Sequence, residues 1–135
     1  MKKLIITFIL ILFSTLIFAQ KNKYQLSSHI LDVSKGTPAS GVKIKLERYN
    51  EQTKNWSFIE EKQTDANGRI ADFLKSQHSN LGIYKLTYFT AAYFNKSGID
   101  SFYPFIEVVF QIKDQNHYHV PITLSAYGYS TYRGN

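Results

Sequence analysis

Two histidines and two arginines of this chain have side chains suited to hydrolytic chemistry on a small anionic ring: His29, Arg69, His119 and Arg133. Imidazole titrates near neutral pH, so a histidine can take a proton from water. A guanidinium presents a planar fork of donors to ring carbonyls and anionic nitrogens, and it can stabilise a developing oxyanion. The alternative for each residue is a structural or surface role, which is the more frequent role of a lone strand histidine.

The segment from residue 117 to residue 135 must position His119 and Arg133. Alternate residues of an extended strand face opposite sides, and the apolar set here alternates with a polar set. The pattern predicts Tyr118, Val120, Ile122 and Leu124 facing the core, with His117, His119, Thr123 and Ser125 facing outward. A turn at Tyr127–Gly128 would return the chain as a short strand over residues 129–132, which places the last residues beside the first strand of this hairpin. We expect this aromatic-rich tail to be held in place rather than frayed.

Three separated motifs carry a resemblance. They are Leu-Ser-Ser-His-Ile-Leu-Asp-Val-Ser-Lys-Gly-Thr-Pro-Ala at residues 26–39, Thr-Asp-Ala-Asn-Gly-Arg at 64–69, and His-Val-Pro-Ile-Thr-Leu-Ser-Ala-Tyr-Gly-Tyr-Ser-Thr-Tyr-Arg-Gly at 119–134. Together they resemble the motifs of the 5-hydroxyisourate hydrolase family, the enzyme relatives of transthyretin. The chain departs from the usual family pattern at Ala126, where proline is usual, and at Asn135, where serine is usual.

The resemblance implies a site and an activity. The family's catalytic residues fall on His29, Arg69 and His119, and the terminal Tyr132, Arg133, Gly134 and Asn135 complete the substrate-binding pocket. The implied reaction opens the ring of 5-hydroxyisourate to 2-oxo-4-hydroxy-4-carboxy-5-ureidoimidazoline in urate catabolism. The implied assembly is a homotetramer, a dimer of dimers with sites where subunits meet, and no metal or organic cofactor is expected.

Two alternatives remain open at this point. An exported transthyretin-like protein that binds a small ligand without catalysis would fit the same fold, although transthyretin itself lacks this set of histidines and arginines. His117 and His119 also form a His-x-His pair that, together with His29, could hold zinc, but two histidines make a weak pattern. We leave His117 outside the catalytic set, and we predict that His78 is a loop residue.

The N-terminal residues have the pattern of a secretory signal peptide over residues 1–19. Lys2 and Lys3 precede an apolar run from Leu4 to Phe18, and Ala19 offers a small residue for cleavage. The run is shorter than the roughly 20 residues of a membrane span, so we expect no stable membrane anchor. The predicted location is outside the cytoplasm, and periplasmic if the cell is Gram-negative.

Residues 20–135 have the length of one domain and the pattern of an all-β fold. We expect about eight short strands in a two-sheet sandwich, over residues 24–33, 42–47, 56–64, 69–73, 81–90, 105–112, 118–125 and 129–132, with one short helix within 91–98. The formal charge of +6 is spread over scattered lysines, which favours a small anionic substrate and argues against nucleic acid as a partner.

Overall fold

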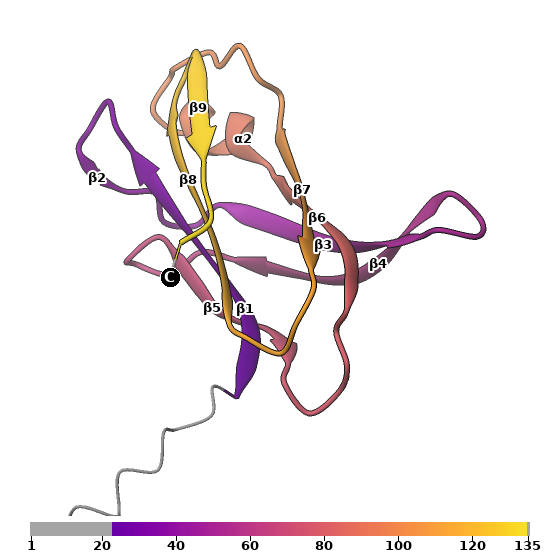
Figure 1. The fold of residues 1–135 in the computed structure, drawn as a ribbon. Coiled ribbons are helices and arrows are strands. Elements are labelled where there is room, and N and C mark those ends of the chain that lie inside the picture. The colour runs from indigo at the N-terminus through magenta and orange to yellow at the C-terminus, as the bar shows by residue number, and fades with distance from the viewer. Residues whose placement is uncertain (1–22, 135) are drawn as a thin grey trace, which may run out of the picture.

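The structure is a computed structural model that describes residues 23–134, and in it two β-sheets pack face to face (Figure 1). We call the sheet with the order β2-β1-β8-β9 sheet A, in which β5 also pairs with β1, and the sheet with the order β4-β3-β6-β7 sheet B. The strands are β1 (Tyr24–Asp32), β2 (Thr37–Pro38), β3 (Lys43–Asn50), β4 (Asn55–Gln63), β5 (Arg69–Lys75), β6 (Gly82–Tyr88), β7 (Ile106–Ile112), β8 (Tyr118–Ser125) and β9 (Gly128–Thr131), and the helix is α2 (Thr90–Asn95). The predicted all-β sandwich with one short helix is therefore confirmed.

One element differs in detail from the sequence-based expectation. The two-residue strand β2 pairs with Leu31 and Asp32 of β1, whereas the sequence predicted only a turn there. Two residues are too few to show a period-two pattern.

The predicted short helix ended by glycine is confirmed. Gly98 has a φ of 67°, its amide bonds to the Asn95 carbonyl at 3.0 Å, and the Ile99 amide bonds to the Phe94 carbonyl at 3.1 Å. These two bonds form a glycine cap that ends the helix α2.

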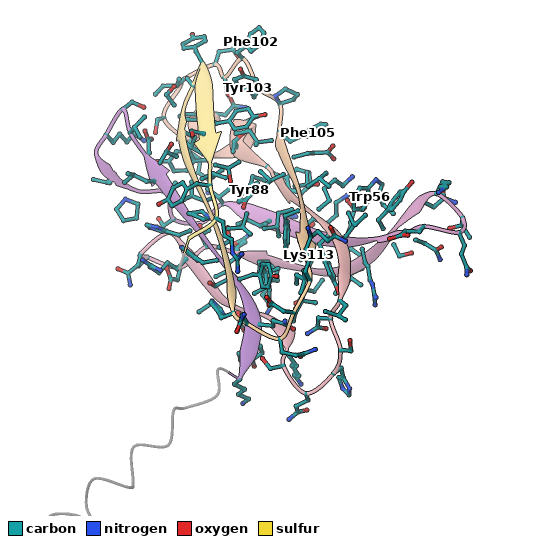
Figure 2. The ribbon with its side chains drawn as sticks, viewed as in Figure 1. Trp56, Tyr88, Phe102, Tyr103, Phe105 and Lys113 are labelled. Carbon is teal, nitrogen blue, oxygen red and sulfur yellow. The ribbon has the colours of Figure 1, made fainter. Side chains whose placement is uncertain are left out.

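The core lies between the two sheets. It is built from the side chains that alternate along each strand and face inward. In β8 the predicted core-facing residues Tyr118, Val120, Ile122 and Leu124 are all buried, and Pro121 is buried as well. In β1 every second side chain from residue 26 to residue 32 is buried. The largest fully buried side chains come from both sheets and from α2: Tyr84, Tyr88, Phe73, Phe94, Leu26, Ile30, Ile44, Leu46, Leu86, Ile112, Ile122 and Leu124. Tyr88 lies at the centre in Figure 2. Burying these groups drives the sheets together and leaves the outer faces free to carry polar residues.

One pairing decides where the candidate residues meet. β1 and β8 lie side by side as a parallel pair, with Ser27 opposite His119 and His29 opposite Pro121, although their sequences are about 90 residues apart (Figure 1). β5 runs antiparallel on the other side of β1 and places Arg69 opposite His29. Sheet A thus gathers three distant motifs.

The predicted signal peptide falls in residues 1–22 and so lies outside the described residues, as does Asn135. Within residues 23–134, no helix is long and apolar enough to cross a membrane.

Candidate active site

The outer face of sheet A brings the three predicted catalytic residues together. His29 in β1 is opposite Arg69 in β5, and His119 in β8 lies one pleat away, opposite Ser27. Both histidines are half-buried and Arg69 is exposed, while the residues between them along each strand point into the core. Residues that share one face of neighbouring strands lie within side-chain reach, so these groups can act on one small molecule.

Arg69 is positioned by the tight turn that precedes β5. The Asp65 carboxylate accepts hydrogen bonds from the amides of Asn67 at 2.8 Å and of Arg69 at 2.9 Å, and the Asp65 amide donates to the Arg69 carbonyl. Gly68 adopts a φ of 69°, and a Cβ there would lie 2.6 Å from the Ile30 carbonyl oxygen. Only glycine fits this turn, which fixes the start of β5 directly against β1.

His119 is held by hydrogen bonds on one edge of its ring. Its Nδ1 lies 2.8 Å from the Ser27 hydroxyl, and that hydroxyl is also 2.8 Å from Nε2 of His117. The other nitrogen of His117, Nδ1, lies 3.1 Å from the Tyr24 carbonyl oxygen. The ring of His119 therefore has a fixed orientation on the sheet face.

The tail closes over the other edge of the His119 ring. The Gly134 amide donates to the His119 carbonyl at 2.9 Å, which extends the β8–β9 pairing toward the chain end. A Cβ on Gly134 would lie 2.5 Å from Cδ2 of His119, closer than real contacts permit. The imidazole occupies the space that a side chain at residue 134 would need, so Gly134 is a packing requirement of the site.

The electrostatic setting keeps both histidines neutral near pH 7. Burial and the neighbouring Arg69 guanidinium lower the pKa of His29, against smaller opposing effects of the Asn67 backbone and the Asp65 carboxylate. Burial, Arg69, His29 and His117 lower the pKa of His119. A neutral imidazole is the form that accepts a proton, so each histidine is available as a base.

Arg133 lies on the other side of sheet A from the histidines. Its guanidinium carbon is 4.8 Å from the centre of the Tyr118 ring, and Tyr118 is a buried residue of the inward face of β8. We expected the last residues to face outward as a unit, and for Arg133 this was wrong. Because Gly134 faces His119, the alternation of an extended chain turns the preceding residue to the opposite side. The side chain of Tyr132, the residue before Arg133, is 60% exposed, so most of its surface faces solvent.

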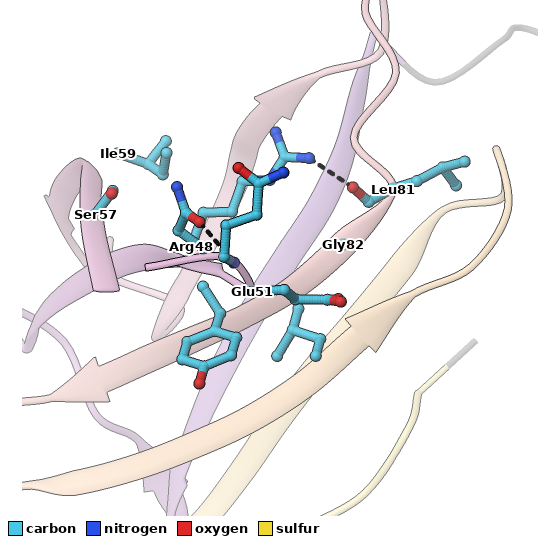
Figure 3. Close-up of a pocket in the computed structure, with 10 residues that line it drawn as sticks. Arg48, Glu51, Ser57, Ile59, Leu81 and Gly82 are labelled. Carbon is cyan, nitrogen blue, oxygen red and sulfur yellow. Dashed lines mark hydrogen bonds between the residues drawn. The ribbon is translucent and has the colours of Figure 1, made fainter. Parts of the chain in front are cut away.

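Three of the hollows on the surface of residues 23–134 bear on the site. One of about 230 Å³ lies beside the two histidines of the candidate site and is lined by Ser27, Ser28, Arg69, Ile70, Ala71 and His117. One of about 350 Å³ lies at the open edge between β7 and the tail and includes Arg133, Tyr118 and Lys113, the last of which is labelled in Figure 2. The third, of about 460 Å³, is larger than these two and lies on sheet B around Arg48 (Figure 3). There the Arg48 guanidinium is already bonded to the Leu81 carbonyl at 2.8 Å, and no histidine lines the hollow.

The His-x-His pair, for which zinc binding was left open as an alternative, takes part in hydrogen bonds. Within residues 23–134 no group of three or more histidines and carboxylates is arranged to hold a metal ion. The Ser27 hydroxyl lies between His117 and His119 and bonds to a nitrogen of each ring. The residues present therefore fit a hydrogen-bonded pair better than a pair of metal ligands.

Sequence reasoning missed Ser27 and set His117 aside, and both lie in the site. The period-two pattern contained the signal, because Ser27 is two residues before His29 and His117 is two residues before His119. His78 lies in an exposed turn, as predicted.

The fold and the site together define a transthyretin-like sandwich with a histidine and arginine face. The pattern of the HIUase/Transthyretin family matches residues 26–134, and the chain belongs to this family. Among curated relatives, a Caenorhabditis elegans protein named "Probable 5-hydroxyisourate hydrolase" is 46% identical over 112 residues, which cover 82% of this chain and 81% of that protein.

Two solved structures show the same fold. The 5-hydroxyisourate hydrolase of Klebsiella pneumoniae has a TM-score of 0.71 and 37% identity, over 84% of this chain and 95% of that one. Sea bream transthyretin, solved in complex with thyroxine, has a TM-score of 0.76 and 32% identity, over 82% of this chain and 94% of that one. The backbone is similar to an enzyme and to a hormone carrier alike, so side chains must decide between the two activities.

Proposed function

We propose that this protein is a hydrolase that opens the ring of 5-hydroxyisourate to 2-oxo-4-hydroxy-4-carboxy-5-ureidoimidazoline in urate catabolism. The observation that carries the proposal is the meeting of His29, Arg69 and His119 on one outer sheet face, from three motifs far apart in sequence. The names of the relatives, which include 5-hydroxyisourate hydrolases and a plant uric acid degradation protein, support the same activity.

The proposed reaction is hydrolysis of a cyclic amide. The oxygen of water bonds to the ring carbonyl carbon, the bond from that carbon to the ring nitrogen breaks, and the product carries a carboxylate where the carbonyl stood. A neutral histidine takes the proton of the attacking water and returns a proton to the leaving nitrogen. The Arg69 guanidinium lies where it can bind the ring anion and stabilise the oxyanion as it forms.

The tail of Tyr132, Arg133, Gly134 and Asn135 is proposed to complete the pocket, with its residues on two sides of the sheet. Gly134 packs on the catalytic face, and Arg133 braces the tail from the other side of the sheet through the Tyr118 ring. Direct contact between Arg133 and substrate stays a prediction. If the guanidinium binds substrate, Arg133→Lys raises KM, whereas a bracing role alone predicts an unchanged KM with a lower kcat.

The proposed assembly is a homotetramer. In a single chain the catalytic face is open to water, and an open face becomes a shielded site when another subunit covers it. Within the described residues β7 ends sheet B opposite β4, and β9 ends sheet A opposite β2, so both β7 and β9 have an open edge that could pair with another copy. Light scattering at micromolar concentration should give a mass near four chains, and a fully active monomer would contradict this assembly.

Export is proposed from the N-terminal pattern. Removal of residues 1–19 would deliver the mature enzyme outside the cytoplasm, to the periplasm in a Gram-negative cell. Intact-mass measurement on protein from the native cell tests this, because a mass that includes the first 19 residues would contradict cleavage.

The activity is tested with freshly generated 5-hydroxyisourate and purified protein, followed by ultraviolet absorbance. The proposal predicts loss of the substrate band far faster than the spontaneous reaction. A rate equal to the spontaneous one, together with tight binding of the ligand, would favour the alternative of an exported small-ligand binding protein without catalysis.

A further inference from the structure

A continuous chain of hydrogen bonds runs from a backbone carbonyl to the candidate base His119. The Tyr24 carbonyl oxygen contacts Nδ1 of His117 at 3.1 Å, Nε2 of the same ring contacts the Ser27 hydroxyl at 2.8 Å, and that hydroxyl contacts Nδ1 of His119 at 2.8 Å. Ser27 is the cross-strand partner of His119, so the register of β1 and β8 builds this chain into the sheet.

The direction of each hydrogen bond follows from the capacities of the groups. A carbonyl oxygen can only accept, so Nδ1 of His117 must carry a proton. In the neutral form of His117 the lone pair is then on Nε2, which must accept the single proton of the Ser27 hydroxyl. Because the Ser27 hydroxyl already donates its one proton to His117, its oxygen can only accept a hydrogen bond from Nδ1 of His119.

We propose that Ser27 and His117 are positioning residues that hold neutral His119 as the tautomer with its proton on Nδ1, and so present its Nε2 as the general base. This deepens the proposed hydrolase function and rests on it for the role of the base. Nε2 is the ring nitrogen that Ser27 does not engage, and it is adjacent to the carbon that packs on Gly134. A lone pair at this atom is what abstraction of a proton from water requires.

The same hydrogen-bond chain identifies what would undo the arrangement. If His117 is removed, the Ser27 hydroxyl loses its acceptor and becomes free to donate to Nδ1 of His119. Neutral His119 would then carry its proton on Nε2 and lose its lone pair there. A glutamine at residue 117 offers a side-chain oxygen to accept from Ser27 and an amide to donate toward the Tyr24 carbonyl, so it should preserve the direction of the bonds.

The tautomer is measured by nitrogen NMR of the full-length protein at pH 8, where an imidazole is mostly neutral. Wild-type His119 should show a protonated Nδ1 and an unprotonated Nε2. His117→Ala should move the proton of His119 to Nε2, and His117→Gln should restore the wild-type spectrum. A wild-type His119 with its proton on Nε2 would overturn the proposal, and this result does not depend on any substrate.

Steady-state kinetics then distinguish a positioning role of Ser27 from a role in folding. Ser27→Ala should lower kcat about tenfold to a hundredfold with little change in KM, because general-base catalysis contributes roughly a hundredfold or more. Ser27→Thr, which keeps the hydroxyl, should recover most of the rate. Full kcat in Ser27→Ala would overturn the proposal.

Ser28→Ala is the matched control. The Ser28 hydroxyl faces the core, where it bonds to the Val120 carbonyl at 2.8 Å and lies 3.0 Å from the Tyr88 hydroxyl. This variant should lower the urea midpoint while the His119 spectrum stays that of the wild type. If Ser28→Ala moves the proton of His119 to Nε2 as His117→Ala does, a general loosening of the sheet explains both results and the proposal fails. If wild-type protein has the expected tautomer but does not turn over 5-hydroxyisourate, the positioning stands and the proposed function fails.

Discussion

The outer faces of the two sheets carry charged residues in opposite ways. On sheet B, Lys85 lies 3.1 Å from Glu47 and 3.0 Å from Glu107, and Glu47 also pairs with Lys45 at 3.2 Å. Burial raises the pKa of Glu47, but its bonds to Lys85 and Lys45 outweigh this and leave the pKa lowered. Each charge there has an opposite partner, which is the pattern of a structural surface.

On the outer face of sheet A the cationic group beside the histidines is the Arg69 guanidinium, and it has no such partner. Among the ion pairs within residues 23–134, none includes Arg69, and the side chains beside it are the two histidines whose pKa it lowers. An unneutralised guanidinium beside neutral imidazoles is unfavourable for folding but favourable for an anionic ligand. The comparison supports a division in which the charges of sheet B stabilise the fold and the charge of Arg69 on sheet A is available to a substrate.

The sharpest way to break this comparison is to remove one cation from each face. Arg69→Met should lower kcat/KM for 5-hydroxyisourate by about a hundredfold to a thousandfold, as loss of an oxyanion-stabilising donor does. Its free energy of unfolding should change by less than about 0.5 kcal/mol, because Arg69 is exposed. Steady-state kinetics and urea unfolding of the same preparation measure both.

Lys85→Met is the matched variant on sheet B. It should keep wild-type turnover and lose about 2 kcal/mol of stability, because Glu107 loses its cationic partner and Glu47 keeps only Lys45. A crossed result, with Lys85 needed for turnover and Arg69 for stability, would refute the division between the faces.

Deleting residues 132–135 sharpens the comparison at the tail. Hydrolysis should fall by about a hundredfold or more, because the chain that closes over His119 is gone. Stability should fall by only about 1 kcal/mol, since β8 keeps its core contacts. Circular dichroism and turnover measure the two effects. The separate variant Asn135→Ser, which restores the serine usual in the family, should have neutral or mildly increased activity. Wild-type turnover in the truncated protein would remove the tail from the site.

Gly134→Ala tests the contact between tail and imidazole alone. The added methyl group must displace either the His119 ring or the tail, so we expect a loss of about tenfold in kcat, consistent with small misplacements of a catalytic group. Gly128→Ala is the control, because a Cβ there meets only the Ser125 hydroxyl at 3.8 Å. Equal activity of the two variants would show that the close packing on His119 has no catalytic consequence.

The smallest expected effect is the pH dependence. The pKa values of His29 and His119 are lowered by burial and by Arg69, so the acid limb of kcat/KM should lie below the ordinary histidine value of about 6.5. The unfolded chain takes up these protons at higher pH than the folded one, so stability should fall as pH drops through and below about 6.5 and be unaffected above it. Arg69→Met should move the limb upward, and His78→Gln should leave it in place. A limb above 6.5 in the wild type would contradict the electrostatic account.

The sequence predicted the faces of the strands well because period-two alternation is a local signal. Alternation and the three motifs together placed His29, Arg69 and His119 in one site, and the parallel pairing of β1 with β8 explains how. That pairing is a long-range contact, which no local pattern reveals. For the same reason the bond between Ser27 and His119 could not be predicted.

The orientation of Arg133 was the main error, and its cause is instructive. The tail was treated as one polar unit, but the alternation of β9 continues to Gly134 and turns Arg133 toward Tyr118. Applying the pattern residue by residue would have separated the two. The two-residue strand β2 has no alternation from which it could be predicted, because its pairing depends entirely on the neighbouring strand β1.

The central claim is that the outer face of sheet A binds the anionic ring, and a crystal structure with bound urate tests it most directly, because urate is a purine anion that lacks the 5-hydroxyl group of the substrate and is stable in water. The account predicts the ring against Arg69, with His29 and His119 beside it and Gly134 at its edge. Urate bound instead in the hollow of Arg48 on sheet B, with the sheet A face empty, would contradict the account.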